Sequence, residues 1–139
     1  MPKFEFRLDT VLRLREREED EMKQAYQAAV ARRIEADQSV EDLRAHRQTT
    51  LVDAPLDLET RRNLAGLLEK FDDDEQALIT IADLLQQEEE SALRRYHLAK
   101  QAAEALRKLR AGRLAEWELS EQRAEQAALD EWAVQRRLA

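Results

Sequence analysis

The chain has 139 residues, of which 38% are charged and only 5% aromatic, with two glycines, two prolines and no cysteine. The missing cysteines exclude disulfides, thiol catalysis and cysteine-type zinc sites, and the net charge of -7 argues against general nucleic-acid binding, which needs a surplus of cations. Residues that cost little to hold helical dominate the rest, so the composition predicts an almost entirely helical protein without a sheet.

A concentrated apolar segment opens the chain. Six large apolar residues fall between Lys3 and Leu14: Phe4, Phe6, Leu8, Val11, Leu12 and Leu14. On a helix, Phe4, Leu8, Val11 and Leu12 would share one arc, whereas Phe6 and Leu14 would point elsewhere. One arc can pack against a partner helix, and the other is surplus.

The first predicted helix covers about residues 4–48, with apolar residues spaced by threes and fours. A break follows in "TTLVDAPLD" at residues 49–57, where Pro55 restricts Ala54 away from helical geometry. Asp53 or Asp57 can cap the next helix. We therefore expect a turn over about residues 49–57.

The second predicted helix covers about residues 58–137 and carries a heptad pattern. Two interleaved series, one starting at Leu64 and one at Leu68, continue to Val134 and Leu138, and sixteen of their twenty-two positions are apolar. The predicted fold class is all-α: an antiparallel two-helix coiled-coil hairpin with a longer second helix, forming a single domain over residues 1–139.

Unequal helices leave part of the second helix without a partner in the chain. A turn centred near residue 54 would put Phe4 opposite residue 104. The apolar series nevertheless continues through Leu106, Leu109, Leu114, Trp117, Leu119, Leu129, Trp132, Val134 and Leu138. Together with the surplus arc at the start of the chain, these residues predict a docking site at the open end of the hairpin. Two alternatives are a homodimer through the same residues and a kink near Gly112 that folds the overhang back.

Charge is uneven along the second helix. Residues 69–90 hold nine acidic groups against one lysine, and residues 94–113 hold seven basic groups against Glu104 alone. Solvated helix faces would explain this contrast, and so would an oppositely charged protein surface.

No catalytic or ligand-binding motif is recognisable. The sequence has no glycine-rich phosphate loop, His46 and His97 are isolated, and the acidic runs lack the spacing of a calcium loop. We expect no enzyme activity, cofactor or metal. No apolar run approaches a membrane span, and the acidic Glu5 and Asp9 do not suit a signal peptide, so we expect a cytoplasmic protein. The net charge disfavours direct attachment to a membrane surface.

Both ends of the chain resemble one protein family. "FEFRLDTVLRLREREEDE" at the start is similar to the N-terminus of the FliJ family of flagellar export proteins. "LRKLRAGRLAEWELSEQRAEQAALDEWAVQR" at residues 106–136 is similar to the C-terminal pattern of that family, which here includes Gln126, Leu129, Asp130, Glu131 and Ala133. The middle of the chain agrees in length and heptad character.

The resemblance implies a non-enzymatic component of the flagellar type III protein export apparatus, cytoplasmic and located at the inner membrane through its partners. Members are two-helix coiled coils similar to the central stalk of rotary ATPases. They bind the hexameric export ATPase, promote its assembly and activity, contact the export gate, a membrane protein, and bind export chaperones. Through export, such a protein serves flagellum biogenesis, motility and chemotaxis. The stalk of a virulence type III secretion system and a self-assembling structural coiled coil are the alternatives.

Carried onto this sequence, the resemblance implies two sets of contact residues. The ATPase-facing set comprises Phe4, Phe6, Leu8, Val11, Leu12, Arg13, Leu129, Asp130 and Glu131, with Arg7 beside them. The set facing the export gate comprises Leu64, Leu68 and Phe71, which we expect to be exposed. His46 and Thr50 stand where the family pattern leads us to expect aromatic anchors.

Overall fold

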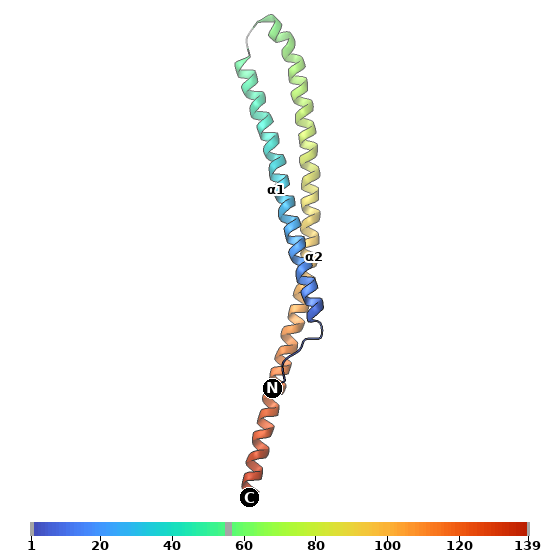
Figure 1. The fold of residues 1–139 in the computed structure, drawn as a ribbon. Coiled ribbons are helices and arrows are strands. Elements are labelled where there is room, and N and C mark those ends of the chain that lie inside the picture. The colour runs from blue at the N-terminus through green and yellow to red at the C-terminus, as the bar shows by residue number, and fades with distance from the viewer. Residues whose placement is uncertain (1, 55–56, 139) are drawn as a thin grey trace. The chain divides into compact units, whose positions relative to one another are not determined.

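The computed structural model describes residues 2–54 and 57–138 (Figure 1). That part of the chain holds two long helices and no strand: α1 spans Asp9–Asp53 with 45 residues, and α2 spans Leu58–Leu138 with 81 residues. The predicted all-α hairpin with a longer second helix is confirmed. Pro55 and Leu56, in the predicted turn, lie outside the described residues.

Helix α1 begins at Asp9, so the predicted start at residue 4 was wrong. The first helical hydrogen bond runs from the Leu12 backbone N to the Leu8 backbone O, at 2.8 Å. Before it, Phe4, Phe6 and Leu8 are partly buried, and the residues between them are exposed. Apolar residues at every second position cannot share one face of a helix, whereas an extended backbone places them all on one side. This spacing favours an irregular segment over a first helical turn.

At its other end α1 continues to Asp53, past the predicted end at residue 48. The Thr49 hydroxyl donates to the Ala45 carbonyl at 3.0 Å, and the Thr50 hydroxyl donates to the His46 carbonyl at 2.9 Å. These bonds satisfy the hydroxyls within the helix, so the two threonines do not interrupt it. The helix ends just before Ala54, which precedes a proline.

Asp57 caps α2, as one of the two predicted candidates. Its side-chain Oδ1 accepts from the Thr60 backbone N at 3.2 Å, and its backbone O accepts from the Arg61 backbone N at 3.1 Å. Helix α2 then continues through Gly112 without interruption. The predicted alternative of a kink at Gly112 that folds the overhang back is therefore wrong.

The chain divides into two compact units, one formed by Glu21–His97 and the other by Met1–Asp20 with Leu98–Ala139. In the Glu21–His97 unit, Arg33 pairs with Glu89 and Arg47 pairs with Asp72. Residue numbers rise along α1 as they fall along α2, so the two helical segments are antiparallel. A single domain over residues 1–139 stays a prediction.

The heptad prediction agrees with burial over most of α2. Every position of the two series from Leu64 to Arg110 is buried or partly buried. Beyond Arg110 the two series differ. In the Leu68 series Trp117 is still partly buried, whereas in the Leu64 series Arg113 is exposed and its neighbour Leu114 is partly buried instead. Small side chains form much of the buried layer, with Ala29 at 2% exposure and Ala103 at 0%. No described helix contains a stretch long and apolar enough to cross a membrane.

Candidate functional site

The N-terminal segment, residues 2–8, lies against α2. The ring of Phe4 sits 6.0 Å from the ring of Trp117, centre to centre, with the two planes tilted by 53°. The Arg110 guanidinium lies 5.5 Å from the centre of the Phe4 ring. We call Phe4, Arg110 and Trp117 the aromatic clamp. Tilted aromatic pairs at this distance and a guanidinium over a ring are both attractive arrangements.

The clamp shows that the predicted register was wrong, because Phe4 lies against Trp117 and not opposite residue 104. Part of this difference in register is already present near the turn. A turn centred at residue 54 would have placed residue 61 opposite Arg47, but Arg47 contacts Asp72. The rest arises from the irregular segment before Asp9. A residue outside a helix can advance about 3.3 Å along its partner, whereas a helical residue advances about 1.5 Å.

A groove of about 770 Å³ separates the N-terminal segment from α2. Its walls alternate in charge, with Glu5 and Arg7 on the segment and Arg113 and Glu116 on the helix. Phe4, Phe6, Leu8, Leu109, Trp117 and Ser120 complete the lining. Next to the lining residues Leu8 and Leu109 in the sequence, Asp9 and Arg110 form an ion pair, in which Asp9 Oδ1 lies 3.3 Å from the arginine Nε.

The remaining residues of the predicted ATPase-facing set are not all surface residues. Leu12 is buried at 6% exposure, so it belongs to the packing between helices, while Val11 and Arg13 are exposed. Leu129, Asp130 and Glu131 are exposed near the end of α2. The groove ends at Ser120, and Leu129 lies nine positions further along the helix, a distance of about 13 Å. The structure therefore does not bring the two halves of the predicted set together.

Every described residue of α2 from Gln122 to Leu138 is exposed. This stretch includes Leu129 at 60% exposure and Trp132 at 57%, with the Arg136 guanidinium 5.0 Å from the Trp132 ring centre. The prediction that this end of α2 keeps uncovered apolar residues is confirmed.

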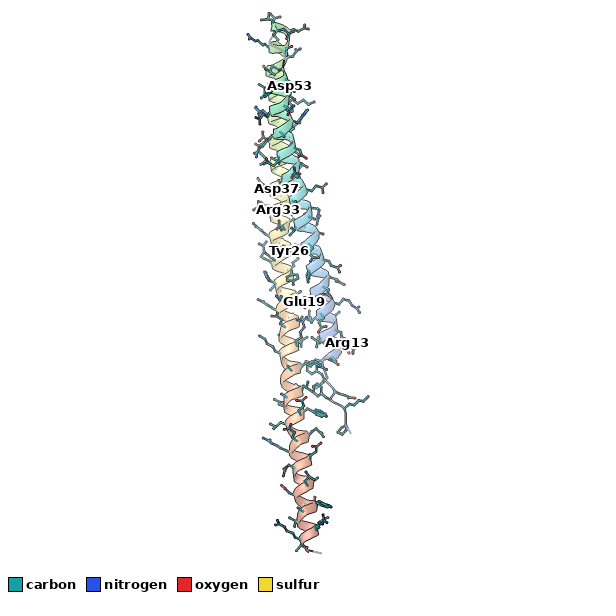
Figure 2. The ribbon with its side chains drawn as sticks, turned by 90° about the vertical axis from the view of Figure 1, so that its left-hand side faces the viewer. Arg13, Glu19, Tyr26, Arg33, Asp37 and Asp53 are labelled. Atoms are coloured by element: carbon teal, nitrogen blue, oxygen red, sulfur yellow. The ribbon has the colours of Figure 1, made fainter. Side chains whose placement is uncertain are left out.

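Pairs of opposite charge occupy the gaps in the apolar seam, a feature that the sequence patterns did not predict. Arg33 on α1 pairs with Glu89 on α2. It also pairs with Asp37, one turn away on its own helix (Figure 2). Arg44 Nε lies 2.8 Å from Glu75 Oε1. Hydrogen bonds to Glu89 and to Glu75 raise the pKa of Arg33 and of Arg44, respectively, so both stay charged at any pH near neutrality.

The same arrangement recurs in the unit that contains the N-terminus. Arg107 contacts both Glu16 and Glu19, and its hydrogen bond to Glu19 raises the pKa of the arginine. The acidic and basic stretches of α2 thus face opposite charges on α1. The contrast in charge along α2 therefore serves in part to pair the two helices. Solvated helix faces and an oppositely charged protein surface were the two interpretations from sequence, and neither included this pairing. Charged residues at seam positions of both helices were the signal that could have revealed it.

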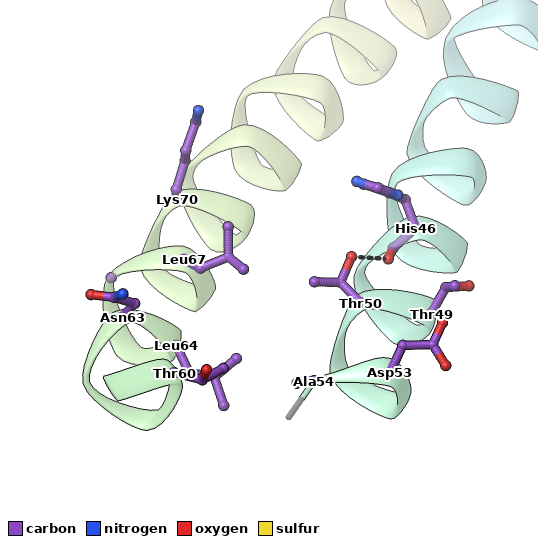
Figure 3. A pocket seen from close by; sticks show the side chains of 11 residues that line it. His46, Thr49, Thr50, Asp53, Ala54, Thr60, Asn63, Leu64, Leu67 and Lys70 are labelled. Atoms are coloured by element: carbon purple, nitrogen blue, oxygen red, sulfur yellow. Dashed lines mark hydrogen bonds between the residues drawn. The ribbon is translucent and has the colours of Figure 1, made fainter. Parts of the chain in front are cut away.

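Near the turn, the ends of α1 and α2 diverge around a cavity of about 760 Å³, which we call the turn cleft (Figure 3). Leu64, Leu67 and Thr60 of α2 and Thr50 and Asp53 of α1 line it. Leu67 and Thr50 point toward each other across the gap (Figure 3). His46, Thr49, Ala54, Asn63, Gly66 and Lys70 complete the lining. The cleft therefore offers two leucines between polar walls.

The expectation that Leu64, Leu68 and Phe71 are exposed was wrong. Phe71 is buried at 7% exposure, with the His46 ring 5.6 Å away in an edge-on arrangement, and the two leucines are partly buried. His46 stands where an aromatic anchor was expected, and it packs against Phe71 within the chain. Because Phe71 is buried, it can hold its neighbours in place for a contact near the turn, but its own side chain is not available to a partner.

Over residues 2–54 and 57–138 the structure has no group of three or more His, Asp or Glu side chains placed to hold a metal ion. The surfaces with functional potential are thus the aromatic clamp with its groove, the exposed end of α2, and the turn cleft. Each offers side chains for contact with a protein.

Comparison with protein families matches residues 4–138 to the family described as flagellar FliJ protein. The chain belongs to the FliJ family. This family is a non-catalytic component of the flagellar type III export apparatus, which agrees with the helical hairpin and its contact surfaces. No curated protein and no solved structure matches the chain. The FliJ match includes both the N-terminal segment and the exposed end of α2.

Proposed function

We propose that this chain binds the hexameric flagellar export ATPase through the unit that contains its N-terminus, promotes assembly and activity of the ring, and couples it to the export gate. The observation that carries the proposal is the FliJ match over residues 4–138, which spans the partly covered aromatic segment at one end and the exposed α2 stretch at the other. Two separate surfaces of this unit would make the contact, one with Phe4, Phe6, Leu8 and Arg13 and the other with Leu129, Asp130 and Glu131. The chain acts in the cytoplasm, at the inner membrane through its partners.

The mechanism requires no chemistry from this chain. A protein that binds the assembled ring more tightly than free ATPase subunits shifts the equilibrium toward the ring, by an amount set by the difference in affinity. Apolar and charged side chains in one docking surface suit that role, because the apolar groups supply affinity and the charges fix orientation. Buried Leu12 would hold the start of α1 in place without touching the ATPase.

Deletion of residues 1–8 tests the ATPase contact. Helix α1 starts at Asp9, so the deletion removes the aromatic segment and leaves both helices complete. We expect helicity by circular dichroism to be nearly unchanged and ATP hydrolysis by the purified export ATPase to fall to its rate without this chain. The matched control is Ile81→Ala, which removes a large apolar residue that is 49% exposed on the other unit and should leave stimulation intact. Full stimulation by the deleted chain would contradict the proposal.

The turn cleft is the proposed contact for the export gate, with Leu64 and Leu67 as its apolar residues. Leu68 and Phe71, the other predicted gate residues, do not line the cleft and would support this end of α2. Export chaperones are further proposed partners, for which no separate surface is assigned. Through these contacts the chain would support flagellum assembly, motility and chemotaxis. Binding to the ATPase of a virulence secretion system in preference to the flagellar enzyme would favour the alternative stalk.

One observation favours a second candidate, a coiled coil that assembles with itself. Exposed Leu129, Trp132, Val134 and Leu138 could pack against a second copy. Sedimentation at micromolar concentration separates the two functions: a monomer that stimulates the ATPase supports the stalk, and a stable oligomer without stimulation supports self-assembly.

A further inference from the structure

We propose that the aromatic clamp is a latch: in the free chain, α2 holds Phe4 against Trp117, and the clamp must open before the N-terminal segment can bind the ATPase ring. The inference rests on the proposed ATPase contact and concerns its regulation. The Phe4 and Trp117 rings lie 6.0 Å apart in a tilted arrangement, so each hides part of the other from a partner while they stay in contact.

The contacts of the segment suit a latch that opens. Among the backbone hydrogen bonds outside the helices, residues 2–8 contribute only the carbonyls of Phe6 and Leu8, and these accept from α1 residues Asp9 and Leu12. Side chains therefore hold the segment on α2. Phe4, Phe6 and Leu8 are each only partly buried, and the Arg110–Asp9 pair is about 40% exposed on both sides. Exposed ion pairs and half-covered aromatic rings are weak contacts that a larger interface can replace.

Closed and open forms also differ in what they expose. When the latch opens, Phe4 and Trp117 become accessible together with the apolar residues that line the groove between segment and helix, Phe6, Leu8 and Leu109. Exposed apolar clusters promote unwanted association. A latch that covers them in the free chain would keep that chain soluble. Docking would then wait until the ATPase ring competes with α2 for the N-terminal segment.

Tryptophan fluorescence tests the closed state in the free chain. Trp132→Phe leaves Trp117 as the only tryptophan. In that background, Phe4→Ala should shift the Trp117 emission to longer wavelength and increase its quenching by acrylamide, because the ring gains contact with water. Lys3→Ala, which removes an exposed neighbouring residue, should change neither. Emission unchanged by Phe4→Ala would overturn the closed latch.

Cross-linking tests whether the latch must open. The chain has no cysteine, so Glu5→Cys with Ser120→Cys, two lining residues from opposite walls of the groove, can be joined by a short, cleavable bis-maleimide. We expect the cross-linked chain to lose ATPase stimulation and to regain it when the linker is cut. Each single-cysteine variant treated with the same reagent is the control. If the uncut double variant folds poorly, Glu5→Cys with Glu116→Cys provides a second pair on the same groove.

The outcomes separate the latch from the function on which it rests. Full stimulation by the cross-linked chain overturns the latch, and the ATPase contact stands if deletion of residues 1–8 still abolishes stimulation. Stimulation that survives the deletion overturns the ATPase contact itself. Trp117→Ala gives an independent result: an opened latch should reach half-maximal stimulation at a lower concentration of this chain, and a need for a higher concentration would contradict it.

Discussion

At the scale of single residues, alanine sets how closely the two helices pack. Ala29, Ala82, Ala92 and Ala103 are buried at 8% exposure or less, and Ala103 is covered completely. A methyl group at such a position leaves no room for a longer side chain unless the helices separate. The alanines that weaken the apolar pattern in the sequence are thus among the most buried residues in the fold.

Ala103→Leu should therefore destabilise the protein. Three extra carbons in a filled layer typically cost about 1–3 kcal/mol through displaced backbone and strained side chains. Urea unfolding followed by circular dichroism measures the loss. Ala105→Leu, two residues away on an exposed position of the same helix, is the matched control and should change stability little. Equal stability of the two variants would show that the seam is looser than the burial of Ala103 indicates.

At the scale of helices, paired charges determine which residues of α1 meet which residues of α2. Arg33 and Arg47 stand fourteen residues apart on α1, and their partners Glu89 and Glu75 stand fourteen residues apart on α2. Both intervals equal two heptads, so the pairs align in one register of the antiparallel hairpin. Polar residues at seam positions commonly fix register in this way, at some cost in stability.

Reversal of one charge of such a pair should therefore lower the stability of the protein, and reversal of both charges should restore most of it. Glu89→Arg places two like charges at a seam position where the Glu89 side chain is only 17% exposed, and we expect a lower Tm. Arg33→Glu combined with Glu89→Arg restores the opposite pair and should recover most of the loss. Arg13→Glu, at an exposed position, serves as a control for reversal of an arginine. If the double variant is no more stable than Glu89→Arg alone, the pair does not contribute to register.

How far the sequence predicts these elements depends on the interaction that forms each one. Heptad spacing fixed α2 and its seam up to Arg110, because burial there follows helical periodicity. The start of α1 was missed because apolar residues at positions 4, 6 and 8 can be counted into a helical arc with Leu12, although their alternate spacing suits extended backbone better. Trp117 as the partner of Phe4 could not be predicted, since it depends on both the wide turn and the irregular segment.

At the scale of the whole molecule, the candidate surfaces separate between the two units. The aromatic clamp, its groove and the exposed end of α2 belong to the unit formed by Met1–Asp20 and Leu98–Ala139. The turn cleft belongs to the unit formed by Glu21–His97. Each unit has its own ion pairs between α1 and α2, Arg107 with Glu19 in one and Arg33 with Glu89 in the other. The proposed contacts with the ATPase and the gate can therefore be tested separately.

A fragment of residues 21–97 should fold by itself and retain one function. We expect it to be helical by circular dichroism, to unfold in a single cooperative transition, and to bind the cytoplasmic part of the export gate without stimulating the ATPase. The same fragment carrying Leu64→Ala and Leu67→Ala, the two leucines that line the turn cleft, should lose binding to the export gate and stay helical. Leu84→Ala, at 59% exposure, is the matched control. A helical fragment that fails to bind the gate would remove the turn cleft from the proposed contacts.

The charge pairs between α1 and α2 also predict how substitutions should be distributed among related proteins. If Arg33 and Glu89 contribute as one unit, a lineage that acquires an acidic residue at position 33 gains from a compensating basic residue at position 89. The two positions should covary in sign among related chains, and positions 47 and 75 should covary in the same way. Exposed positions such as 13 should drift independently of both.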